Sequence, residues 1–233
     1  MVRIGHAVGD ENGKGRGGAA GDQTGKEIRV QNFYVRDGGW KYYLEPPTVD
    51  IGNRAAHYML AICTSPQFGY DRDQRWTGYD AIKQRGVYYA KKSEFDCSSL
   101  VLSCYRFAGL LQLREKWGST STMVDQLKSC GFKVYTDTKH TTKPEYMRAG
   151  GVLVTPGHHT AMVLDDGGKI TPMENKVHII GGAVNIRTKP KTGDVVKIAY
   201  KGEKYELIGV DTTGWYKIPD GYISNREDLT EVI

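Results

Sequence analysis

The sequence predicts an α+β fold followed by a small all-β barrel, and three stretches carry this prediction. In residues 97–111 the apolar side chains recur at helical spacing, which predicts a helix that begins at or near Cys97. Residues 151–164 have the pattern of two short strands joined by a Pro-Gly turn. From about Val177 onward, short strands alternate with turn residues, as expected of a small barrel.

The composition indicates a soluble globular protein. The chain has 233 residues, of which 39% are hydrophobic and 25% charged, enough for one large or two smaller domains. No apolar run approaches a membrane span, and the first residues lack the basic-then-apolar layout of a signal peptide. The net charge of +5 favours an anionic polymer as partner. Because no dense Lys/Arg run or nucleic-acid motif is present, we expect that this polymer is not a nucleic acid.

The N-terminal region is expected to combine a strand with a glycine-rich loop. Residues 2–8 alternate as a half-buried strand does, which places His6 on the core side together with Val2 and Ile4. Residues 13–18 satisfy a GxGxxG pattern, but no long apolar strand leads into it and no helix follows. We therefore expect a mobile or close-packed loop there rather than a nucleotide site.

Helices are expected in the middle of the chain. Residues 53–65 have the pattern of a mostly buried helix, and residues 68–76 that of a polar and aromatic loop. A capping-box spacing and a glycine stop predict another helix within residues 120–131. The same box at residues 142–145 predicts a short helix that ends at Gly150.

Cys97 is the candidate nucleophile. The N-terminal end of a helix offers free N–H groups and a positive dipole end, which stabilise a thiolate, the nucleophilic form of cysteine. A histidine on a downstream strand, here His158 or His159, commonly completes such a pair. The alternative is that Cys97 is a small buried hydrophobic residue, as free cysteines often are.

The four cysteines are expected to be free thiols. None form a CxxC pair, and Cys97 and Cys104 lie seven residues apart on one predicted helix, too far along its axis for a bridge. We expect structural roles for Cys63, Cys104 and Cys130. A metal enzyme is an alternative that would use Cys130, His140, His158 and His159. Because this spacing fits no standard zinc pattern, we expect neither a metal nor a cofactor.

Two motifs together carry a family resemblance. Asp-Cys-Ser-Ser-Leu-Val at residues 96–101 and Gly-His-His-Thr-Ala-Met-Val at residues 157–163 resemble the NlpC-type cell-wall cysteine peptidases and the related peptidoglycan amidases of the phage-endolysin kind. These enzymes are papain-like. The resemblance implies a papain-like catalytic domain over residues 1–172, with Cys97 as the nucleophile and His159 as the base.

The third catalytic residue fits the family resemblance only if the core is circularly permuted. In ordinary NlpC-type enzymes this residue, often a histidine, lies on the strand after the histidine strand, whereas residues 165–172 contain no histidine. The Ile-Gly-His-Ala strand at residues 4–7 is similar to the missing strand. The resemblance therefore implies that His6 orients the catalytic imidazole, with Asp165 or Asp166 as the alternative.

The resemblance also implies residues on the substrate side. Related enzymes carry a tyrosine upstream of the cysteine, and Tyr70 is the candidate here, with a surface turn as the alternative. The other candidate substrate contacts are Asp96, Ser98 and His158; Asp96 would also hold the helix start, and His158 is the second choice of base. Gly151 departs from the family, which usually has aspartate there, and we expect this to cost a structural hydrogen bond.

The C-terminal strands resemble the bacterial SH3-like domain. The segments Val-Asn-Ile-Arg, Gly-Trp-Tyr-Lys-Ile and Gly-Tyr-Ile carry the resemblance, which covers nearly all of residues 177–233. It implies a cell-wall anchor in which Trp215 and Tyr222 are candidate ligand contacts. Burial in the core is the alternative, because alternation buries every second residue of a strand.

Taken with the resemblance, the sequence predicts a peptidoglycan hydrolase that cleaves an amide bond of the stem peptide by a Cys-His thiol mechanism. An endopeptidase is favoured; the alternatives are an N-acetylmuramoyl-L-alanine amidase and a non-catalytic wall-binding protein. The expected partner is bacterial peptidoglycan, with teichoic acid as a second anionic component. Without a recognisable signal peptide, we expect release from the cytoplasm at lysis or secretion by another route. The sequence does not predict the oligomeric state.

Overall fold

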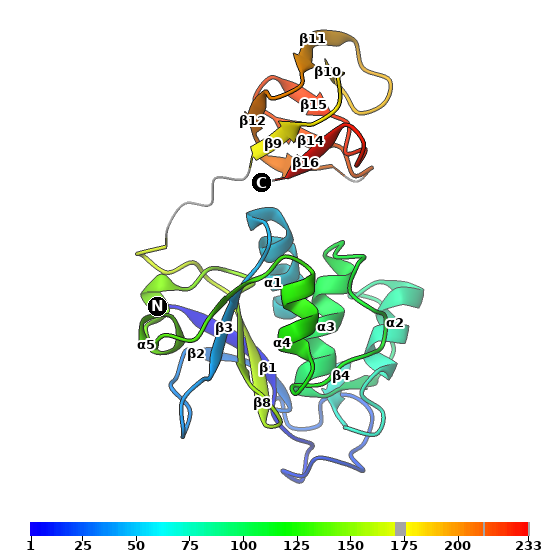
Figure 1. Cartoon of the computed structure of the whole chain (residues 1–233). Coiled ribbons are helices and arrows are strands. Elements are labelled where there is room, and N and C mark those ends of the chain that lie inside the picture. The colour runs from blue at the N-terminus through cyan, green and yellow to red at the C-terminus, as the bar shows by residue number, and fades with distance from the viewer. Residues whose placement is uncertain (171–175, 212, 233) are drawn as a thin grey trace. The chain divides into compact units, whose positions relative to one another are not determined.

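The computed structural model describes residues 1–170, 176–211 and 213–232. The chain forms two compact units, Met1–Thr171 and Pro172–Ile233, which we describe separately (Figure 1). Residue 172, the predicted end of the first domain, lies outside the described residues. In the part of the chain that the structure describes, no helix is both long and apolar enough to cross a membrane.

The first unit is a mixed α/β domain built on a six-stranded antiparallel sheet. The strand order is β2-β1-β8-β7-β3-β6, so the N-terminal strand lies between its sequence neighbour and a strand from the far end of the unit. The strands are β1 (Arg3–Ala7), β2 (Ile28–Asn32), β3 (Tyr42–Glu45), β6 (Lys133–Tyr135), β7 (Val152–Thr155) and β8 (His159–Val163). In the β1–β8 pair, Ile4 is opposite Val163 and Gly5 is opposite Met162.

Helices pack on one face of this sheet. The helices α1 (Val49–Cys63) and α3 (Cys97–Phe107) contact both each other and strands β1 and β8. The approach of α1 is so close that a Cβ atom on Gly5 would lie 2.5 Å from the side chain of Met59. Around them lie α2 (Thr77–Arg85), α4 (Met123–Ser129) and the parallel strand pair β4 (Phe68–Tyr70) and β5 (Ser93–Phe95). The helix α5 (Thr138–Thr142) and the 3₁₀ helix η1 (Pro144–Tyr146) contact each other, and His140 of α5 stacks on Tyr43 of β3.

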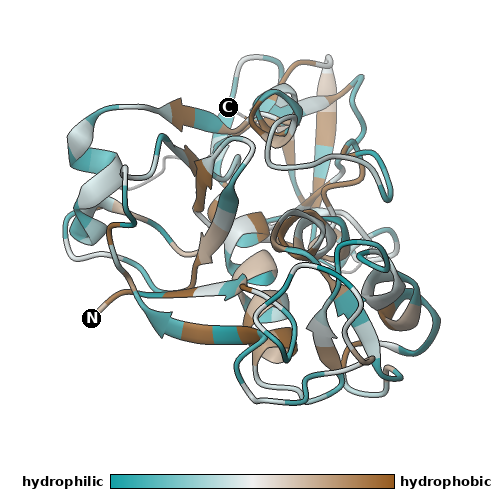
Figure 2. Ribbon diagram, turned by 90° about the horizontal axis from the view of Figure 1, so that it is seen from below, coloured by the Kyte–Doolittle hydropathy of each residue, from teal (hydrophilic) through white to brown (hydrophobic). Residues whose placement is uncertain are grey.

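Both faces of the sheet are buried. Leu44, Val154 and Met162 face the helices and join the main core. On the other side Leu153, Ala161 and neighbouring strand residues join a second, partly aromatic cluster that includes Trp40 and Tyr43. Figure 2 shows apolar residues concentrated on the strands and helices, and hydrophilic residues on the loops. Burial of alternate strand residues on opposite faces fixes the register of the sheet.

Several predicted elements are found with shifted ends, and three expectations are wrong. The predicted loop at residues 68–76 begins with strand β4. The predicted capping box at Thr122 is absent, because its side chain bonds to Ser119 instead of capping α4. No single helix runs to Gly150. Pro144 lacks an N–H and disfavours helical geometry in the residue before it, so α5 ends at Thr142 and a separate 3₁₀ turn follows.

The second unit consists of two open sheets. One has the strand order β11-β10-β15-β14-β13 and the other β12-β9-β16. The strands are β9 (Lys176–Ile179), β10 (Ala183–Arg187), β11 (Val195–Tyr200), β12 (Lys204–Glu206), β13 (Gly209–Val210), β14 (Tyr216–Ile218), β15 (Gly221–Ile223) and β16 (Thr230–Val232). Their core contains Val177, Ile179, Val184, Ile186, Ala199, Ile218 and Ile223.

The predicted small barrel is therefore corrected: the described residues form no closed barrel. Within residues 204–210 the chain forms two short strands, β12 and β13, which join different sheets. Strand β11 is left as the edge of the larger sheet. The short strands β9 and β16 were not predicted.

Candidate active site

Cys97 is the first residue of helix α3. Strand β5 ends at Phe95, and the extended backbone of Asp96 (φ −103°, ψ 178°) forms the N-cap. The Asp96 carboxylate accepts the backbone N–H of Ser99 at 2.7 Å, and the Ser99 hydroxyl accepts the backbone N–H of Asp96 at 2.9 Å. This reciprocal capping box fixes the thiol at the helix start.

A buried ion pair holds the same helix end. The Arg75 guanidinium lies 2.8 Å from the Asp96 carboxylate, and Arg75 also bonds to the Ser98 hydroxyl and to the carbonyl of Gly118. Ser98 donates to Asp96 at 2.9 Å. The polar atoms of Asp96 and Ser98, both predicted substrate contacts, are thus engaged within the protein. Arg75 was missed in the sequence, since nothing in its spacing links it to Asp96.

The pairing of β1 with β8 brings two histidines together. Nδ1 of His6 lies 2.8 Å from Nε2 of His159, and the His6 side chain is 1% exposed. The Trp40 ring stacks on the His159 ring at a centroid distance of 5.9 Å. When His159 donates this hydrogen bond through Nε2, its Nδ1 is the nitrogen left to accept a proton. Trp40 was noted in the sequence only as part of an aromatic cluster.

The thiol adjoins the same strand. The backbone N–H of Thr160, the residue after His159, favours the thiolate of Cys97 and acts to lower the pKa of the thiol. Helix α3 packs directly on β8. Cys97 therefore lies beside the backbone of β8, while the side chains of His159 and His6 contact each other.

Burial keeps all three groups neutral. It raises the pKa of Cys97 to about 12, with the Asp96 carboxylate adding to the rise and the Thr160 and Ser98 N–H groups opposing it. Burial also lowers the pKa of His159 to about 3, helped by His6. It lowers the pKa of His6 to about 4. The expectation of a thiolate stabilised by the helix start is therefore wrong for the unliganded protein, because desolvation outweighs the N–H groups.

Cys97 and His159 open into different cavities. The cavity that we call the cysteine cleft, of about 280 Å³, is lined by Cys97, Tyr70, Arg72 and other residues. His159 lines a second cavity of about 550 Å³ together with Tyr34 and Arg36. The exposed side chain of His158 borders both cavities.

Asp165, Asp166 and Gly151 are the other positions that the resemblance singled out. The carboxylate of Asp165 pairs with Arg3 at 2.7 Å, and that of Asp166 accepts the backbone N–H of Ala149 at 2.9 Å. Both alternatives to His6 thus have partners other than His159. At Gly151 a Cβ atom would lie 2.4 Å from the Tyr43 ring.

Tyr43 accounts for the missing family aspartate. Its hydroxyl accepts the backbone N–H of Arg148 at 2.7 Å. A tyrosine thus occupies the space that a side chain at residue 151 would need, and it makes a buried hydrogen bond at that point.

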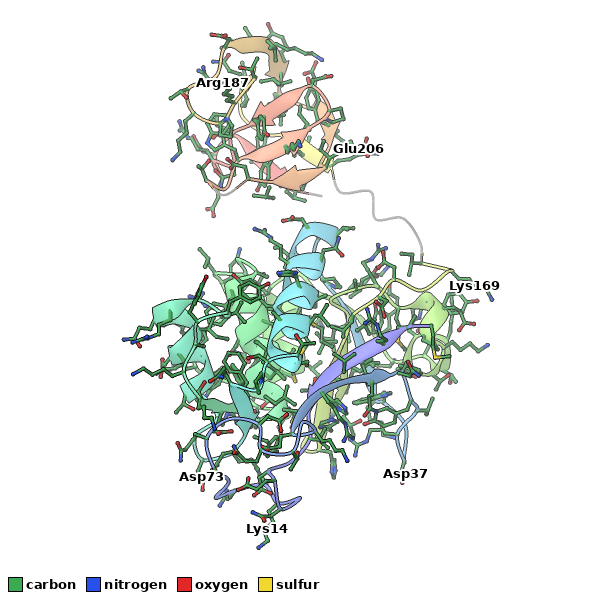
Figure 3. All side chains as sticks on the ribbon, turned by 180° about the vertical axis from the view of Figure 1, so that it is seen from behind. Lys14, Asp37, Asp73, Lys169, Arg187 and Glu206 are labelled. Atoms are coloured by element: carbon green, nitrogen blue, oxygen red, sulfur yellow. The ribbon has the colours of Figure 1, made fainter. Side chains whose placement is uncertain are left out.

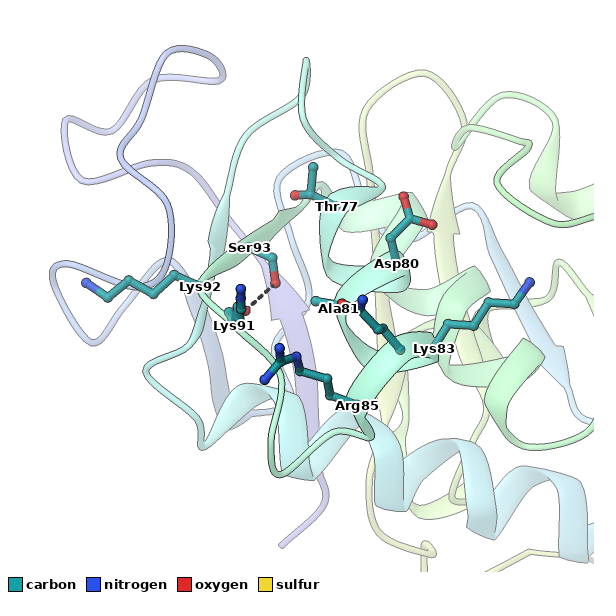
Figure 4. A pocket seen from close by; sticks show the side chains of 9 residues that line it. Thr77, Asp80, Ala81, Lys83, Arg85, Lys91, Lys92 and Ser93 are labelled. Carbon is teal, nitrogen blue, oxygen red and sulfur yellow. Dashed lines mark hydrogen bonds between the residues drawn. The ribbon is translucent and has the colours of Figure 1, made fainter.

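Two further cavities are lined by none of Cys97, His159 and His6. Figure 4 shows one of about 500 Å³ beside α2, lined by Lys83, Arg85, Lys91 and Lys92 among others. In the second unit a cavity of about 330 Å³ is lined by Trp215, and Tyr222 lies on strand β15 outside that lining. All four cysteines are free. Among the described residues, no group of three or more His, Cys, Asp or Glu side chains is placed to hold a metal ion.

The first unit thus holds a buried cysteine at a helix start, a cleft beside it and a pair of histidines in contact. Residues 4–170 match the family model of the endolysin-like domain, and the chain belongs to this family. Membership indicates a cell-wall lytic function with peptidoglycan as the substrate. No curated protein and no solved structure matches the chain.

Proposed function

We propose that the protein is a thiol amidohydrolase of peptidoglycan in which Cys97 is the nucleophile, His159 the base and His6 the residue that orients His159. The observation that carries this proposal is the 2.8 Å contact between His6 and His159 on the strand that packs against the Cys97 helix. A nucleophile, a base and a third residue that orients the base recur in such enzymes.

The neutral resting state sets the proton path. On substrate binding, Nδ1 of His159 takes the thiol proton while Sγ of Cys97 attacks the amide carbonyl. The N–H groups at the start of α3 stabilise the oxyanion, a contribution of about 3 kcal/mol in comparable sites. The protonated His159 then gives its proton to the departing amine. Water, deprotonated by His159, hydrolyses the thioester and releases the carboxylic acid and the free thiol.

The sheet order supports a papain-like core that is circularly permuted. In NlpC-type enzymes the third catalytic residue follows the histidine strand in the sequence. Here the strand next to β8 is β1, at the N-terminus of the chain, and it carries His6. The place beside the histidine strand is thus taken by the N-terminal strand of the domain, and not by the strand that follows β8 in the sequence.

The second unit is proposed to be an SH3-like domain that anchors the protein to the wall. In the cavity at Trp215, an aromatic ring and the cations Arg187, Lys191 and Arg226 lie together (Figure 3 labels Arg187). Such a lining suits an anionic wall component, either peptidoglycan carboxylates or teichoic acid phosphates. The protein would reach the wall after release from the cytoplasm at lysis or by another route of secretion.

Mass spectrometry of the fragments released from purified Gram-positive walls tests the function. An endopeptidase, which we favour, creates new amino termini within stem peptides. An N-acetylmuramoyl-L-alanine amidase instead creates free L-Ala termini on intact stems. Cys97→Ser should release neither product. If wild type also releases nothing but still pellets with walls, the protein is a non-catalytic binder.

A further inference from the structure

The lining of the cysteine cleft carries excess positive charge. Its charged residues are Arg16, Arg72, Arg75 and Asp96. Arg75 and Asp96 neutralise each other, with side chains only 20% and 8% exposed. Arg16 contacts Asp73 at 3.3 Å, but both side chains are more than 60% exposed, so this pair is weak. Arg72 has no ion pair among the described residues. Two arginines therefore remain available to a ligand.

Neutral donors line the same cleft. Tyr70, Ser119 and Thr120 contribute hydroxyl groups for which the described residues supply no hydrogen-bond partner. Tyr70 lies among charged groups: burial raises its pKa, the neighbouring Cys97 and Asp96 add to the rise, and Arg72 opposes it. Apart from the already paired Asp96, the cleft offers a ligand hydrogen-bond donors and positive charge. This chemistry suits an anion.

The glycine-rich loop of residues 9–26 holds Arg16 in place. The N–H of Gly17 donates to Asp71 at 3.0 Å and that of Gly21 to Glu94 at 2.7 Å. Gly17 and Gly21 have φ values of +82° and +87°, a region that favours glycine. These bonds tie the loop to buried carboxylates beside strands β4 and β5.

The same loop contacts Arg72. The N–H of Arg72 donates to the carbonyl of Gly15 at 3.1 Å, directly before Arg16. Figure 3 shows Lys14 of this loop and Asp73 at the same end of the first unit. These bonds therefore hold the backbone segments that carry the two arginines next to each other.

We propose that Arg16 and Arg72 bind a carboxylate of the substrate peptide in the cysteine cleft, so that the protein selects stem peptides in which this carboxylate is free over those in which it is amidated. The inference rests on the proposed function, because it takes a stem peptide as the ligand. A guanidinium matches a carboxylate in both geometry and charge. The carboxylate can come from the glutamyl α-carboxyl group or from the C-terminus of the peptide.

Peptide binding to full-length Cys97→Ala, which lacks the nucleophile, tests the proposal by calorimetry. The probes are L-Ala-γ-D-Glu-L-Lys-D-Ala, its glutamyl α-amide and its C-terminal amide. We expect one of the amides to bind at least tenfold more weakly than the free peptide, and that amide identifies the carboxylate. When Arg16→Gln and Arg72→Gln are added to Cys97→Ala, the affinity for the free peptide should fall to that of the weakly bound amide. Arg85→Gln, in the cavity beside α2, is the charge-matched control and should change nothing.

Equal binding of the three peptides would overturn the proposal. So would a preference that survives the double arginine substitution, or no binding of any peptide. Turnover of the same peptides by protein with Cys97 intact tests the proposed function separately. If the free peptide binds selectively but is never cleaved, the carboxylate site stands and the proposed catalysis fails.

Discussion

Nδ1 of His6 and Nε2 of His159 lie 2.8 Å apart although 153 residues separate them in the chain. One of the two rings must donate this hydrogen bond. If His159 donates through Nε2, its Nδ1 carries a lone pair and can act as a base. In that case Nε2 of His6 carries a proton. Burial lowers the pKa of His6, and the side chain of Gln31 partly opposes this because it favours the protonated ring. The contact is compatible with the tautomer of His159 that the proposed reaction needs.

Replacing His6 should reduce catalysis more than stability. We expect His6→Ala to lower kcat/KM by roughly 10²- to 10⁴-fold, because the imidazole of His159 loses the partner that fixes its ring and tautomer. His6→Gln should retain part of the activity, since an amide can still accept the hydrogen bond. The measurement is the rate of peptide cleavage, with circular dichroism to verify folding. His57→Ala, at an exposed position of α1, is the matched control.

Unchanged kcat/KM in a folded His6→Ala protein would show that another residue orients His159. Asp165 and Asp166 would then need to leave their present partners, Arg3 and the backbone of residue 149.

The local parts of this site could be predicted from the sequence, whereas the contacts between distant segments could not. The helix at Cys97 and the strands β7 and β8 follow from short-range periodicity and a Pro-Gly turn. The proximity of β1 to β8 was expected only from the family resemblance, because strand pairing depends on side chains that lie far apart in sequence.

Packing decided the points that the sequence left open or got wrong. The ion pair of Arg75 with Asp96 left no pattern in the sequence. The ionisation of Cys97 was predicted wrongly because helix position favours the thiolate, while burial depends on the whole fold and favours the thiol. The barrel was predicted wrongly because a break within residues 204–210 sends two short strands to different sheets.

Cys97 should react slowly with iodoacetamide in the unliganded protein. Burial raises the pKa of its thiol to about 12, so the thiolate is a minor form at neutral pH and increases about tenfold with each pH unit. We expect the alkylation rate at Cys97, followed by mass spectrometry, to keep rising up to at least pH 10. A rate that levels off below pH 8 would indicate a thiolate–imidazolium pair in the resting protein and contradict the neutral mechanism.

Asp96→Ala should strongly destabilise the first unit. The substitution removes the helix cap, worth about 1 kcal/mol, and leaves the Arg75 guanidinium without its partner, which costs roughly 3–5 kcal/mol for a buried pair. Urea unfolding of the first unit measures the loss. Asp96→Asn keeps an acceptor for the N–H of Ser99 and should lose less. Equal stability of wild type and Asp96→Ala would mean that Arg75 finds solvent or another acceptor.

The histidine pair should make the first unit sensitive to acid. Burial lowers the pKa of His6 to about 4, whereas an unfolded histidine titrates near 6.5. Between these two values the unfolded chain binds a proton that the folded chain does not, so stability falls as the pH falls. The loss reaches about 1.4 kcal/mol per pH unit for one histidine. His159, with its pKa lowered to about 3, adds in the same direction.

His6→Gln isolates this effect from that of Glu94, which has the opposite sign. Burial raises the pKa of Glu94 to about 8, so its contribution to stability is lost as the pH rises from its ordinary value near 4.5 towards 8. Because wild type and His6→Gln share Glu94, the difference between their unfolding free energies at pH 6.5 and pH 4.5 reports His6 and its effect on His159 without the contribution of Glu94. We expect the variant to lose less stability over this interval, with His57→Gln behaving as wild type. The same loss in all three proteins would mean that folding does not lower the pKa of His6. The ring would then be protonated below about pH 6.5 and could not accept the hydrogen bond from His159.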